Sequence, residues 1–446
     1  MIVKNKVLIN FLWKILDKIF ILILQFFIGV KIANHYGSLE YGKYIFLLSI
    51  INLFQIFYSL FDEKVVKKEL AKNKKQLMNT LLSIKILFNL LVVIIAIFFV
   101  YLNMYQDYIF LFILLIINSF FQEITTTIML IFDYNLNSKY IVLVNNLIKI
   151  IIIILQYIVI KLNYDINFIV FSSIIGGVIG NLIIFNIYKK LYKLSYNFEL
   201  NRRLAQDIIK KSYHLWTSFI CFLIYTQIDK FIIVKFLRIE DVAVYNIAVN
   251  LSNVLLILIG PLRVSVFPLL FQLYTKNREE YMKIYLSLNR LITVIYIIII
   301  ILSIPILNIT FSFVYTVEYN EAKIIYSILS FGIIFKVVSF LQTTHFILEE
   351  KTAKITFKMI IGVFLNFLLN FLLLKLNLKG IAIATTVTQI LTLYLLDYFI
   401  TEYREIFFLQ TNSFKFWKVK DDIKNIQLLK SITLEIEDDL LKKVEE

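Results

Sequence analysis

The sequence predicts an all-α membrane protein with about twelve transmembrane helices. Of the 446 residues, 60% are hydrophobic, and the mean hydropathy is +0.81. Soluble domains are about 45–50% apolar, whereas an apolar run of about 20 residues is long enough to cross the ~30 Å hydrocarbon core of a bilayer. Runs of this length recur along the whole chain, separated by short polar segments. We therefore place the chain among polytopic membrane proteins.

Twelve apolar segments are expected to cross the membrane. They are about 9–31, 43–61, 81–102, 108–131, 141–160, 167–188, 213–235, 243–268, 286–308, 322–348, 356–374 and 380–400. The loops between them alternate in charge, because Lys and Arg gather in the N-terminus and in every second loop, most densely at 64–75 and 189–211. The positive-inside rule then places both the N-terminus and the C-terminus in the cytoplasm.

A weak internal repeat divides the chain into two halves. Asp17-Lys18 is followed by Glu40-Tyr41-Gly42-Lys43-Tyr44, and Asp229-Lys230 is followed by Asp241-Val242-Ala243-Val244-Tyr245. Six spans per half give both halves the same orientation, and in such transporters the substrate path lies between the halves. We predict an N-terminal lobe at 1–188, a cytoplasmic inter-lobe loop at 189–212, a C-terminal lobe at 213–401 and a cytoplasmic tail at 402–446. The tail is either a helix on the inner leaflet or, as we favour, a solvated and partly ordered segment.

Charged residues well inside the spans are the candidate functional groups. A charge at the centre of a bilayer costs at least ~2.5–3.5 kcal/mol, so it normally faces a protein interior or a water-filled cavity. The cations are Arg263, Lys336, Lys149, Lys230 and Lys18, and the acids are Asp229, Glu123 and Asp17.

The cations would line a cavity for an anionic substrate such as a phosphate or pyrophosphate headgroup. Arg263 carries most weight, since a guanidinium binds phosphate oxygens in a bidentate manner and keeps its charge when desolvated. The acids would titrate or bind Na⁺, and so couple transport to H⁺ or Na⁺. A structural interhelical pair remains the alternative for the Asp17-Lys18 and Asp229-Lys230 doublets. Four residues nearer span ends are interpreted as snorkelling to the interface: Lys14, Lys85, Arg290 and Lys358.

Few residues in the chain suggest a hinge, a catalytic site or a metal site. Gly260-Pro261 lies beside Arg263, and Pro in a span frees a backbone carbonyl and kinks the helix, so we predict a hinge, with a static kink as the alternative. Cys221 is the single cysteine, and the three histidines do not occur at metal-ligand spacing. Because no nucleophile–base pair or nucleotide motif is visible, we predict a transporter with no catalytic residue, metal, organic cofactor or nucleic-acid partner.

Several segments resemble those of one family. The residues Asp229-Lys230-Phe231-Ile232-Ile233, Glu240-Asp241, Tyr245, Ala248 and Phe267-Pro268 resemble the seventh and eighth helices of the Wzx-type oligosaccharide flippases. These form the polysaccharide-biosynthesis branch of the MATE/MurJ-like (MOP) transporter superfamily. Asn366, Asn370 and 379–385 are similar to the family's join between helices eleven and twelve, although the first Gly-Ile of its G-I-x-G-A-A-x-A-T pattern is missing. Tyr36-Gly37 and 40–44 resemble its first external loop, so the resemblance covers about 9–400.

This resemblance implies a MATE-like fold of two six-helix lobes around a central cavity. It implies alternating access that carries an undecaprenyl-pyrophosphate-linked oligosaccharide to the external leaflet of the bacterial inner membrane, for O-antigen or capsule synthesis. The expected partners are this lipid-linked oligosaccharide and the bilayer, with a polysaccharide polymerase and chain-length machinery as further partners. The alternatives are a multidrug exporter of the same superfamily, an integral-membrane polysaccharide polymerase and a scaffold.

Overall fold

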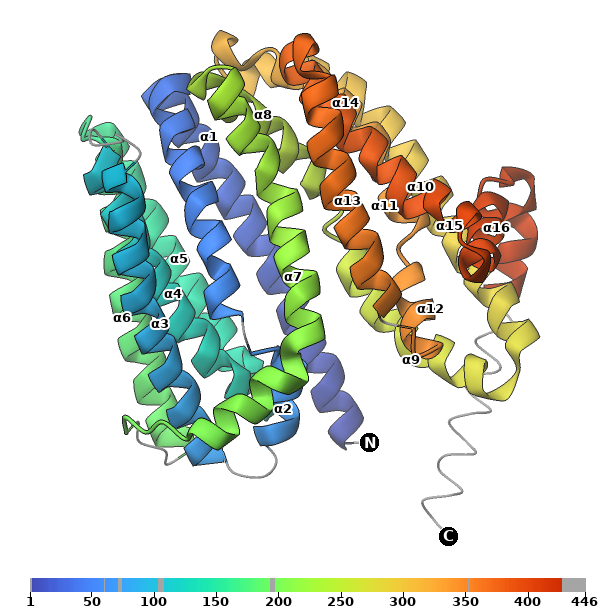
Figure 1. Ribbon diagram of the computed structural model, residues 1–446, viewed down its shortest axis with the longest axis horizontal. Helices are drawn as coiled ribbons and strands as arrows, with labels where there is room; N and C mark the ends of the chain where they lie inside the picture. The colour runs from blue at the N-terminus through green and yellow to red at the C-terminus, as the bar shows by residue number, and fades with distance from the viewer. Residues whose placement is uncertain are drawn as a thin grey trace. The chain divides into compact units, whose positions relative to one another are not determined.

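The computed structural model describes residues 2–59, 61–70, 74–102, 108–135, 137–192, 197–351 and 353–426. Every regular element in these ranges is a helix, which confirms the predicted all-α class (Figure 1). Ten helical segments in the described part are long and apolar enough to cross a membrane. The first of them, Ile19–Phe57, includes most of two predicted spans, and α7, which contains the predicted span 213–235, is not among the ten. The chain is therefore a multi-pass membrane protein.

The longer helices follow the predicted spans. They are α1 (Ile2–Tyr58), α3 (Lys74–Leu102), α4 (Ile109–Tyr134), α5 (Ser138–Lys161), α6 (Ile166–Tyr192), α7 (Arg202–Phe236), α8 (Ile239–Val254), α9 (Ile259–Lys276), α10 (Arg278–Val314), α11 (Ala322–Val338), α13 (Ala353–Leu372) and α14 (Asn377–Ile390). The shorter elements are α2 (Glu63–Leu70), η2 (Val317–Tyr319), α12 (Gln342–Leu348), η3 (Leu374–Leu376), the π-helix η4 (Leu391–Leu395), α15 (Leu396–Phe399), η5 (Thr401–Tyr403), α16 (Arg404–Ser413) and η6 (Phe416–Lys418).

The chain forms two compact units. Unit 1 comprises Met1–Val244 and Val314–Tyr319, and unit 2 comprises Tyr245–Phe313 and Asn320–Glu446. The predicted division into lobes on either side of 189–212 stays a prediction.

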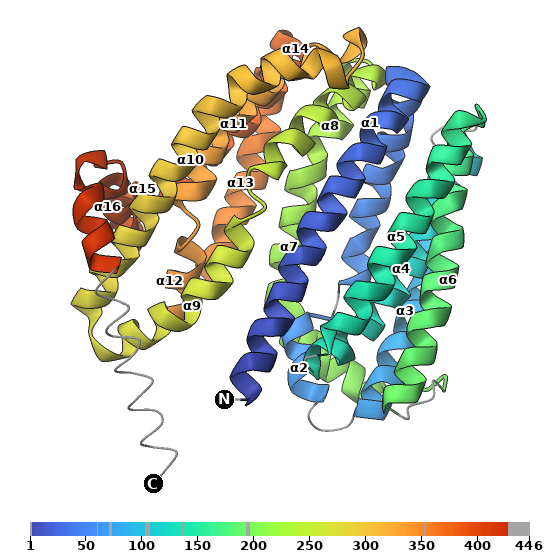
Figure 2. The same cartoon turned by 180° about the vertical axis from the view of Figure 1, so that it is seen from behind.

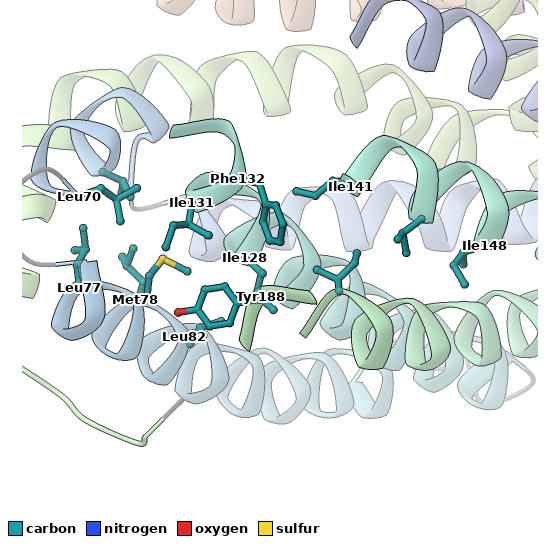
Figure 3. Packing of buried hydrophobic residues seen from close by; sticks show 14 of the residues in the cluster. Leu70, Leu77, Met78, Leu82, Ile128, Ile131, Phe132, Ile141, Ile148 and Tyr188 are labelled. Carbon is teal, nitrogen blue, oxygen red and sulfur yellow. The ribbon is translucent and has the colours of Figure 1, made fainter. Parts of the chain in front are cut away.

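Unit 1 is built around a core where its helices share one end. Leu77 and Met78 begin α3, Ile131 lies near the end of α4, and Tyr188 lies near the end of α6, and all four side chains are almost fully buried. Leu70 of the short helix α2 closes the same cluster (Figure 3). Neighbouring helices that run in opposite directions bring such ends together, so burial of these apolar groups fixes the order of α3 to α6.

Helix α1 is two helices joined at Gly37. This residue has φ of 73°, in the left-handed region that residues with a Cβ rarely adopt. The segment 314–319 covers the bend through hydrogen bonds to both sides of it. Asn34 Nδ2 donates to the Val314 carbonyl at 2.7 Å, Tyr319 Oη donates to the Ala33 carbonyl at 2.8 Å, and the Ser38 backbone N–H donates to Glu318 Oε2 at 3.0 Å. The bend separates the predicted spans 9–31 and 43–61.

The first copy of the predicted sequence repeat contacts the start of α8 in unit 1. A Cβ added to Gly42 would lie 2.3 Å from the carbonyl oxygen of Ile239, the first residue of α8. Only glycine allows this close approach of two backbones. Further along α1, the ring of Phe46 meets the ring of Phe231 on α7 edge to face, with centroids 5.4 Å apart. The second half of α1 therefore packs along α7 and against the start of α8.

Helix boundaries differ from the predicted spans where helices extend outside the apolar runs or break inside them. Helix α7 begins at Arg202, within the predicted loop 189–212, and Asn201 caps it by accepting the Leu204 N–H at 3.1 Å. The predicted span 243–268 is broken at 255–258, between α8 and α9. The predicted span 322–348 is likewise broken between α11 and α12. Hydropathy reports burial in lipid, whereas these ends and breaks depend on local hydrogen bonds.

The C-terminal part of unit 2 folds back onto the span helices. Helix α16 lies beside α15 and α10 in both views (Figure 1, Figure 2). Tyr403 and Ile406 are buried against Phe346 of α12, and Leu409 and Ile426 pack on a second cluster around Tyr281. The favoured prediction of a solvated tail is therefore wrong for residues 402–426, because these apolar groups are removed from water. The remainder of the predicted tail, 427–446, lies outside the described residues.

Candidate functional site

The predicted cations are divided between the two units. Lys149 on α5 and Lys230 on α7 belong to unit 1, whereas Arg263 on α9 and Lys336 on α11 belong to unit 2. The side chains of Lys18 and Asp17 lie outside those that the structure describes. Neither unit therefore contains all the predicted cations.

Lys149 is a half-buried cation in an apolar helix. It has no hydrogen bond or ion pair to any other residue that the structure describes. One turn earlier on α5, the Oδ1 atom of Asn146 is buried and has no hydrogen-bond partner among the described residues. Residues three apart lie on one helix face, so donor and acceptor groups with unmet hydrogen bonds occur together here. This arrangement is suited to binding a polar group that accepts a hydrogen bond from Lys149 and donates one to Asn146 Oδ1.

Arg263 is the corresponding residue of unit 2. It is half-buried in the second turn of α9 and, within the described part of the chain, has no hydrogen bond or ion pair. One turn earlier, Ile259 packs against a cluster that contains Ile333 and Val337 of α11. Lys336 lies in the last turn of α11, where the negative end of the helix dipole stabilises a positive charge. The helix segments that carry Arg263 and Lys336 thus pack against a common cluster.

The predicted hinge lies directly after a break in the helix. Residues 255–258 form successive turns, with Ile257 N–H donating to the Val254 carbonyl and Ile259 N–H to the Leu256 carbonyl. Gly260 and Pro261 then occupy the first turn of α9, where the missing N–H of proline removes no intrahelical hydrogen bond. A Cβ at Gly260 would meet no atom within 4 Å. The break is a structural fact, and its role as a hinge stays a prediction.

Glu123, a predicted coupling acid, is paired with Lys85, which the sequence analysis interpreted as snorkelling to the interface. Lys85 Nζ on α3 donates to Glu123 Oε2 on α4 at 2.7 Å, and the two side chains are 12% and 17% exposed. The interpretation of Lys85 as snorkelling is therefore wrong, since its ammonium group points to an acid inside unit 1. Glu123 therefore already has a cationic partner within unit 1.

The second predicted acid, Asp229, lies on α7 and is 6% exposed. It is followed by Lys230, whose Nζ donates to Gln227 Oε1 at 3.3 Å. Asp229 shares its helix face with the fully buried Ile233, one turn later. The doublet therefore combines a buried acid with a cation that is hydrogen-bonded to a neutral side chain.

A closed ion-pair network in unit 2 was not anticipated. Lys358 Nζ on α13 donates to Asp397 Oδ1 on α15 at 2.6 Å and to Gln342 Oε1 on α12 at 3.0 Å. Gln342 Nε2 in turn donates to Asp397 Oδ2, so that each of the three side chains contacts the other two. Lys358 is 6% exposed and Asp397 0%. The snorkelling interpretation is wrong for Lys358, whose charge is neutralised inside the protein.

Arg290 forms a second closed network. Its Nη1 atom donates to both carboxylate oxygens of Asp422, at 2.7 and 2.9 Å, and its Nε atom donates to the Asn412 carbonyl at 3.1 Å. Ser287 Oγ donates to the same carboxylate at 2.8 Å. Both charged side chains are less than 5% exposed. Snorkelling is therefore wrong for Arg290 as well, and the sidechain of Lys14 lies outside the described set.

Residues that carried the family resemblance form one buried polar cluster in unit 2. Asn366 Nδ2 donates to Thr385 Oγ1 at 3.4 Å, and Asn370 Nδ2 donates to Asn366 Oδ1 at 3.2 Å. The hydroxyl groups of Tyr245 and Thr385 are 3.3 Å apart. The cluster joins α8, α13 and α14, and all four residues are buried. Segments that are distant in the sequence are thus brought together by their polar groups.

Three residues of metal-ligating type meet at one end of unit 2. Possible ligand atoms of His345, Glu349 and Glu405 lie within 4.8 Å of one another. Arg278 already bridges the two carboxylates at 3.1 and 3.2 Å, and Lys351 Nζ donates to Glu349 at 2.8 Å. Because these cations neutralise the acids, the arrangement favours an ion-pair network. Burial would raise the pKa of Glu349, but the hydrogen bond from Lys351 and the charges of His345 and Arg278 together hold that pKa below its usual value.

The sequence contained a signal for one of the two ion-pair networks that the sequence analysis missed, the network of Lys358. Lys358 and Asp397 are opposite charges in consecutive predicted spans, a pattern that favours pairing. No comparable signal existed for Arg290, because its partner lies 132 residues away in the predicted tail.

Fold and charge pattern together define a multi-pass, all-helical membrane protein with polar and charged groups held inside apolar helices. Among known families, the one described as polysaccharide biosynthesis protein matches residues 7–274. This match covers more than half of the chain, so the protein belongs to the polysaccharide biosynthesis protein family. A comparison with curated proteins found no match.

Solved structures of transporters share this fold. The lipid II flippase MurJ in an inward closed conformation has a TM-score of 0.63 at 16% identity, covering 96% of this chain and 99% of that chain. An inward-facing multidrug resistance MATE family transporter of the MOP superfamily has a TM-score of 0.66 at 13% identity, covering 90% and 96%. A MOP superfamily transporter from Pyrococcus furiosus has a TM-score of 0.60 at 12% identity, covering 92% and 96%. The predicted MATE/MurJ-like fold is therefore confirmed.

Proposed function

We propose that the protein is a flippase that moves a polyprenyl-pyrophosphate-linked oligosaccharide from the cytoplasmic to the external leaflet by alternating access. The observation that carries this proposal is membership of the polysaccharide biosynthesis protein family in a chain with a MurJ-like fold. A membrane transporter in such a pathway has to move an amphiphile with a charged headgroup. The product would serve surface polysaccharide synthesis, as O-antigen or capsule.

The predicted cations inside the helices are the proposed headgroup ligands. A pyrophosphate has several anionic oxygens, which bind guanidinium and ammonium groups through charge-assisted hydrogen bonds. Arg263 and Lys149 are half-buried and have no hydrogen bond or ion pair to other described residues. They remain the first candidates, with Lys230, Lys336 and Lys18 in supporting positions. In contrast, Arg290, Lys358 and Lys85 are engaged by acids of the protein, which makes their charges unavailable to a substrate.

Coupling to H⁺ or Na⁺ is assigned to the acids of unit 1. Asp229 is the stronger candidate because it is buried beside a cation, whereas Glu123 is already paired with Lys85. Asp17 completes the proposed set. The break at 255–258 with Gly260 and Pro261 would let the start of α9, and with it Arg263, move as the cavity changes its opening.

This function implies a location in the cell, a membrane topology and a set of partners. The protein would lie in a bacterial cytoplasmic membrane with both termini in the cytoplasm, organised as lobes 1–188 and 213–401. Its substrate is the lipid-linked oligosaccharide, and a polysaccharide polymerase with chain-length machinery would use the flipped product.

Complementation tests the function. The gene is expressed in a bacterium that lacks its own oligosaccharide-unit flippase, and surface polysaccharide and the lipid-linked unit on the inner leaflet are both measured. Restored surface glycan with cleared intermediate is expected, and Arg263→Ala at equal membrane abundance should abolish both effects. Arg404→Ala is the matched control, because Arg404 is exposed and its contacts among the described residues are a hydrogen bond to the Tyr398 carbonyl and a cation–π contact with the Tyr398 ring. Transport that survives Arg263→Ala would remove Arg263 from the site.

Export of small molecules is the competing function, since multidrug transporters share this fold. Their substrates are often cationic, and a cavity lined by cations would repel them. The same strain is therefore scored for resistance to cationic drugs. Failure to restore glycan for several repeat-unit structures, together with gained resistance, would overturn the flippase proposal in favour of drug export.

A further inference from the structure

The segment that follows the last span has two chemically different faces. This C-terminal segment, residues 401–426, comprises η5, α16, η6 and a helical stretch at 419–426, and it begins two residues after the candidate span Leu374–Phe399 ends. One face contacts the rest of unit 2, and the other is exposed. The two faces divide the charges of the segment unequally.

Its acids are used to hold the segment in place. Glu402 pairs with Lys354 of α13, and Glu405 pairs with Arg278 of α10 at 3.2 Å. Asp422 pairs with the buried Arg290 of α10 at 2.7 Å. Together with the packing of Tyr403, Ile406 and Ile426, these contacts neutralise three of the four acids in the segment. Asp421 is the fourth, and it is exposed.

Three of the four lysines in the segment remain available. Lys418, Lys420 and Lys424 are exposed and form no ion pair with any described residue. In the stretch 419–426 the buried Asp422 and the packed Ile426 are one turn apart, so they face inward together. Lys420 and Lys424 are also one turn apart and face outward. The pairing of the acids thus leaves an outer face with a net positive charge.

Large apolar side chains accompany these lysines. Trp417 is 75% exposed, and Phe408, Ile423 and Phe416 are between 45% and 55% exposed. Phe399, the last residue of the preceding span, is 74% exposed. Aromatic residues beside lysines are typical of segments that lie in the headgroup region of a bilayer, where the ring enters the acyl boundary and the ammonium group meets lipid phosphates.

We propose that the outer face of the C-terminal segment, formed by Trp417, Phe416, Ile423 and the three lysines, binds the anionic phospholipid surface of the membrane that the last span crosses. Charge complementarity and continuity with that span single out this occupant, because the chain leaves the bilayer only two residues before the segment begins. The inward face would then connect the bound lipid surface to α10 through Arg290. This inference concerns the protein's own anchoring and does not depend on the transported substrate.

Trp417 provides a direct test with the full chain. Wild-type protein and its Trp417→Phe variant are placed in nanodiscs of phosphatidylcholine, with or without phosphatidylglycerol, using lipids brominated near the headgroup end of the acyl chains. The difference in fluorescence between the two proteins isolates Trp417 from Trp13 and Trp216. We expect bromine to quench this difference at least about twofold, more in the anionic membrane than in the neutral one, with protection from aqueous acrylamide.

Two matched triple variants test the charge requirement. Lys418→Gln/Lys420→Gln/Lys424→Gln should remove the preference for the anionic membrane. Lys189→Gln/Lys190→Gln/Lys210→Gln removes three equally exposed charges outside the segment and should leave Trp417 quenching unchanged. Acrylamide access without bromine quenching would place the face in water, and protection from both quenchers would mean a protein cover. Either result, or equal quenching in both membranes, would overturn the proposal.

Discussion

Two arginines of unit 2, Arg263 and Arg290, show opposite uses of the same side chain. Arg290 on α10 is 3% exposed and is held by both carboxylate oxygens of Asp422. Arg263 on α9 is half-buried and has no hydrogen bond or ion pair within the described residues. A buried guanidinium with a bidentate partner belongs to the structure, whereas one kept without a partner is available for a ligand. The neighbourhood, and not the residue type, separates the two roles.

The same contrast extends to the lysines. Lys358 is enclosed by Asp397 and Gln342, and Lys85 is paired with Glu123. Lys149 has neither kind of partner among the described residues. Substituting one member of an ion-pair network should therefore lower the stability of the fold. Substituting a cation without a partner should reduce transport and leave stability unchanged.

The largest effect is expected in the Lys358 network. Asp397→Ala would leave a buried ammonium group without a counter-ion, which typically costs about 3–5 kcal/mol. The measurement is the Tm of the purified protein in detergent, which should fall clearly. Lys358→Met/Asp397→Leu removes both charges and should recover most of the loss, while Lys379→Met, at an exposed lysine, is the neutral control. A Tm equal to that of the wild type would mean that the pair is not a stabilising contact.

Arg290→Lys should have an intermediate effect. Lysine keeps the charge, but it has a single nitrogen and lacks the separate Nε–H that donates to the Asn412 carbonyl beside the Asp422 pair, so a loss of about 1–3 kcal/mol is expected. Since Asp422 lies in the C-terminal segment, trypsin should also cleave at Lys418 and Lys420 faster in the variant. Arg404→Lys, at an exposed site, serves as the control. Unchanged Tm and cleavage rate would show that the segment is held by its apolar contacts alone.

The contrast between paired and unpaired charges also shows what could be predicted from the sequence and what could not. Apolar runs of bilayer length predicted the spans, and the residues around Asn366 and Thr385 that carried the resemblance do form a cluster. Partners were harder to predict, because the position of Arg290 near a span end suggested the interface and gave no sign of Asp422. Asp422 approaches Arg290 only after the chain folds back, and no periodicity reports such a contact. Long-range geometry therefore decides which charges are neutralised.

A smaller effect on stability is expected for the unpaired cations. Arg263→Met and Lys149→Met remove charges that no described acid compensates, so Tm should stay within a shift worth about 1 kcal/mol or rise slightly. Glycan transport in the complementation strain should nevertheless be lost for Arg263→Met. This separation of stability from transport is the signature of a ligand-binding group. A large fall in Tm would instead reveal a structural partner for the residue.

The smallest effect concerns Glu349, at the end of α12, and its dependence on pH. Burial by itself would raise the pKa of Glu349, but the hydrogen bond from Lys351 with the charges of His345 and Arg278 lowers it below the usual 4.5. A carboxyl with a lowered pKa in the folded state stabilises the fold above pH 4.5, and this contribution is lost as the pH falls through the lower value. Because Lys351 and Arg278 are 42% and 57% exposed, the contribution should be below about 1 kcal/mol.

Glu349→Gln should lower Tm slightly at neutral pH, and the difference in Tm from the wild type should disappear as the pH falls below 4.5. Glu350→Gln, at the exposed neighbouring residue, should show no such gap, and a gap that persists in acid would assign the effect of Glu349 to packing instead of charge.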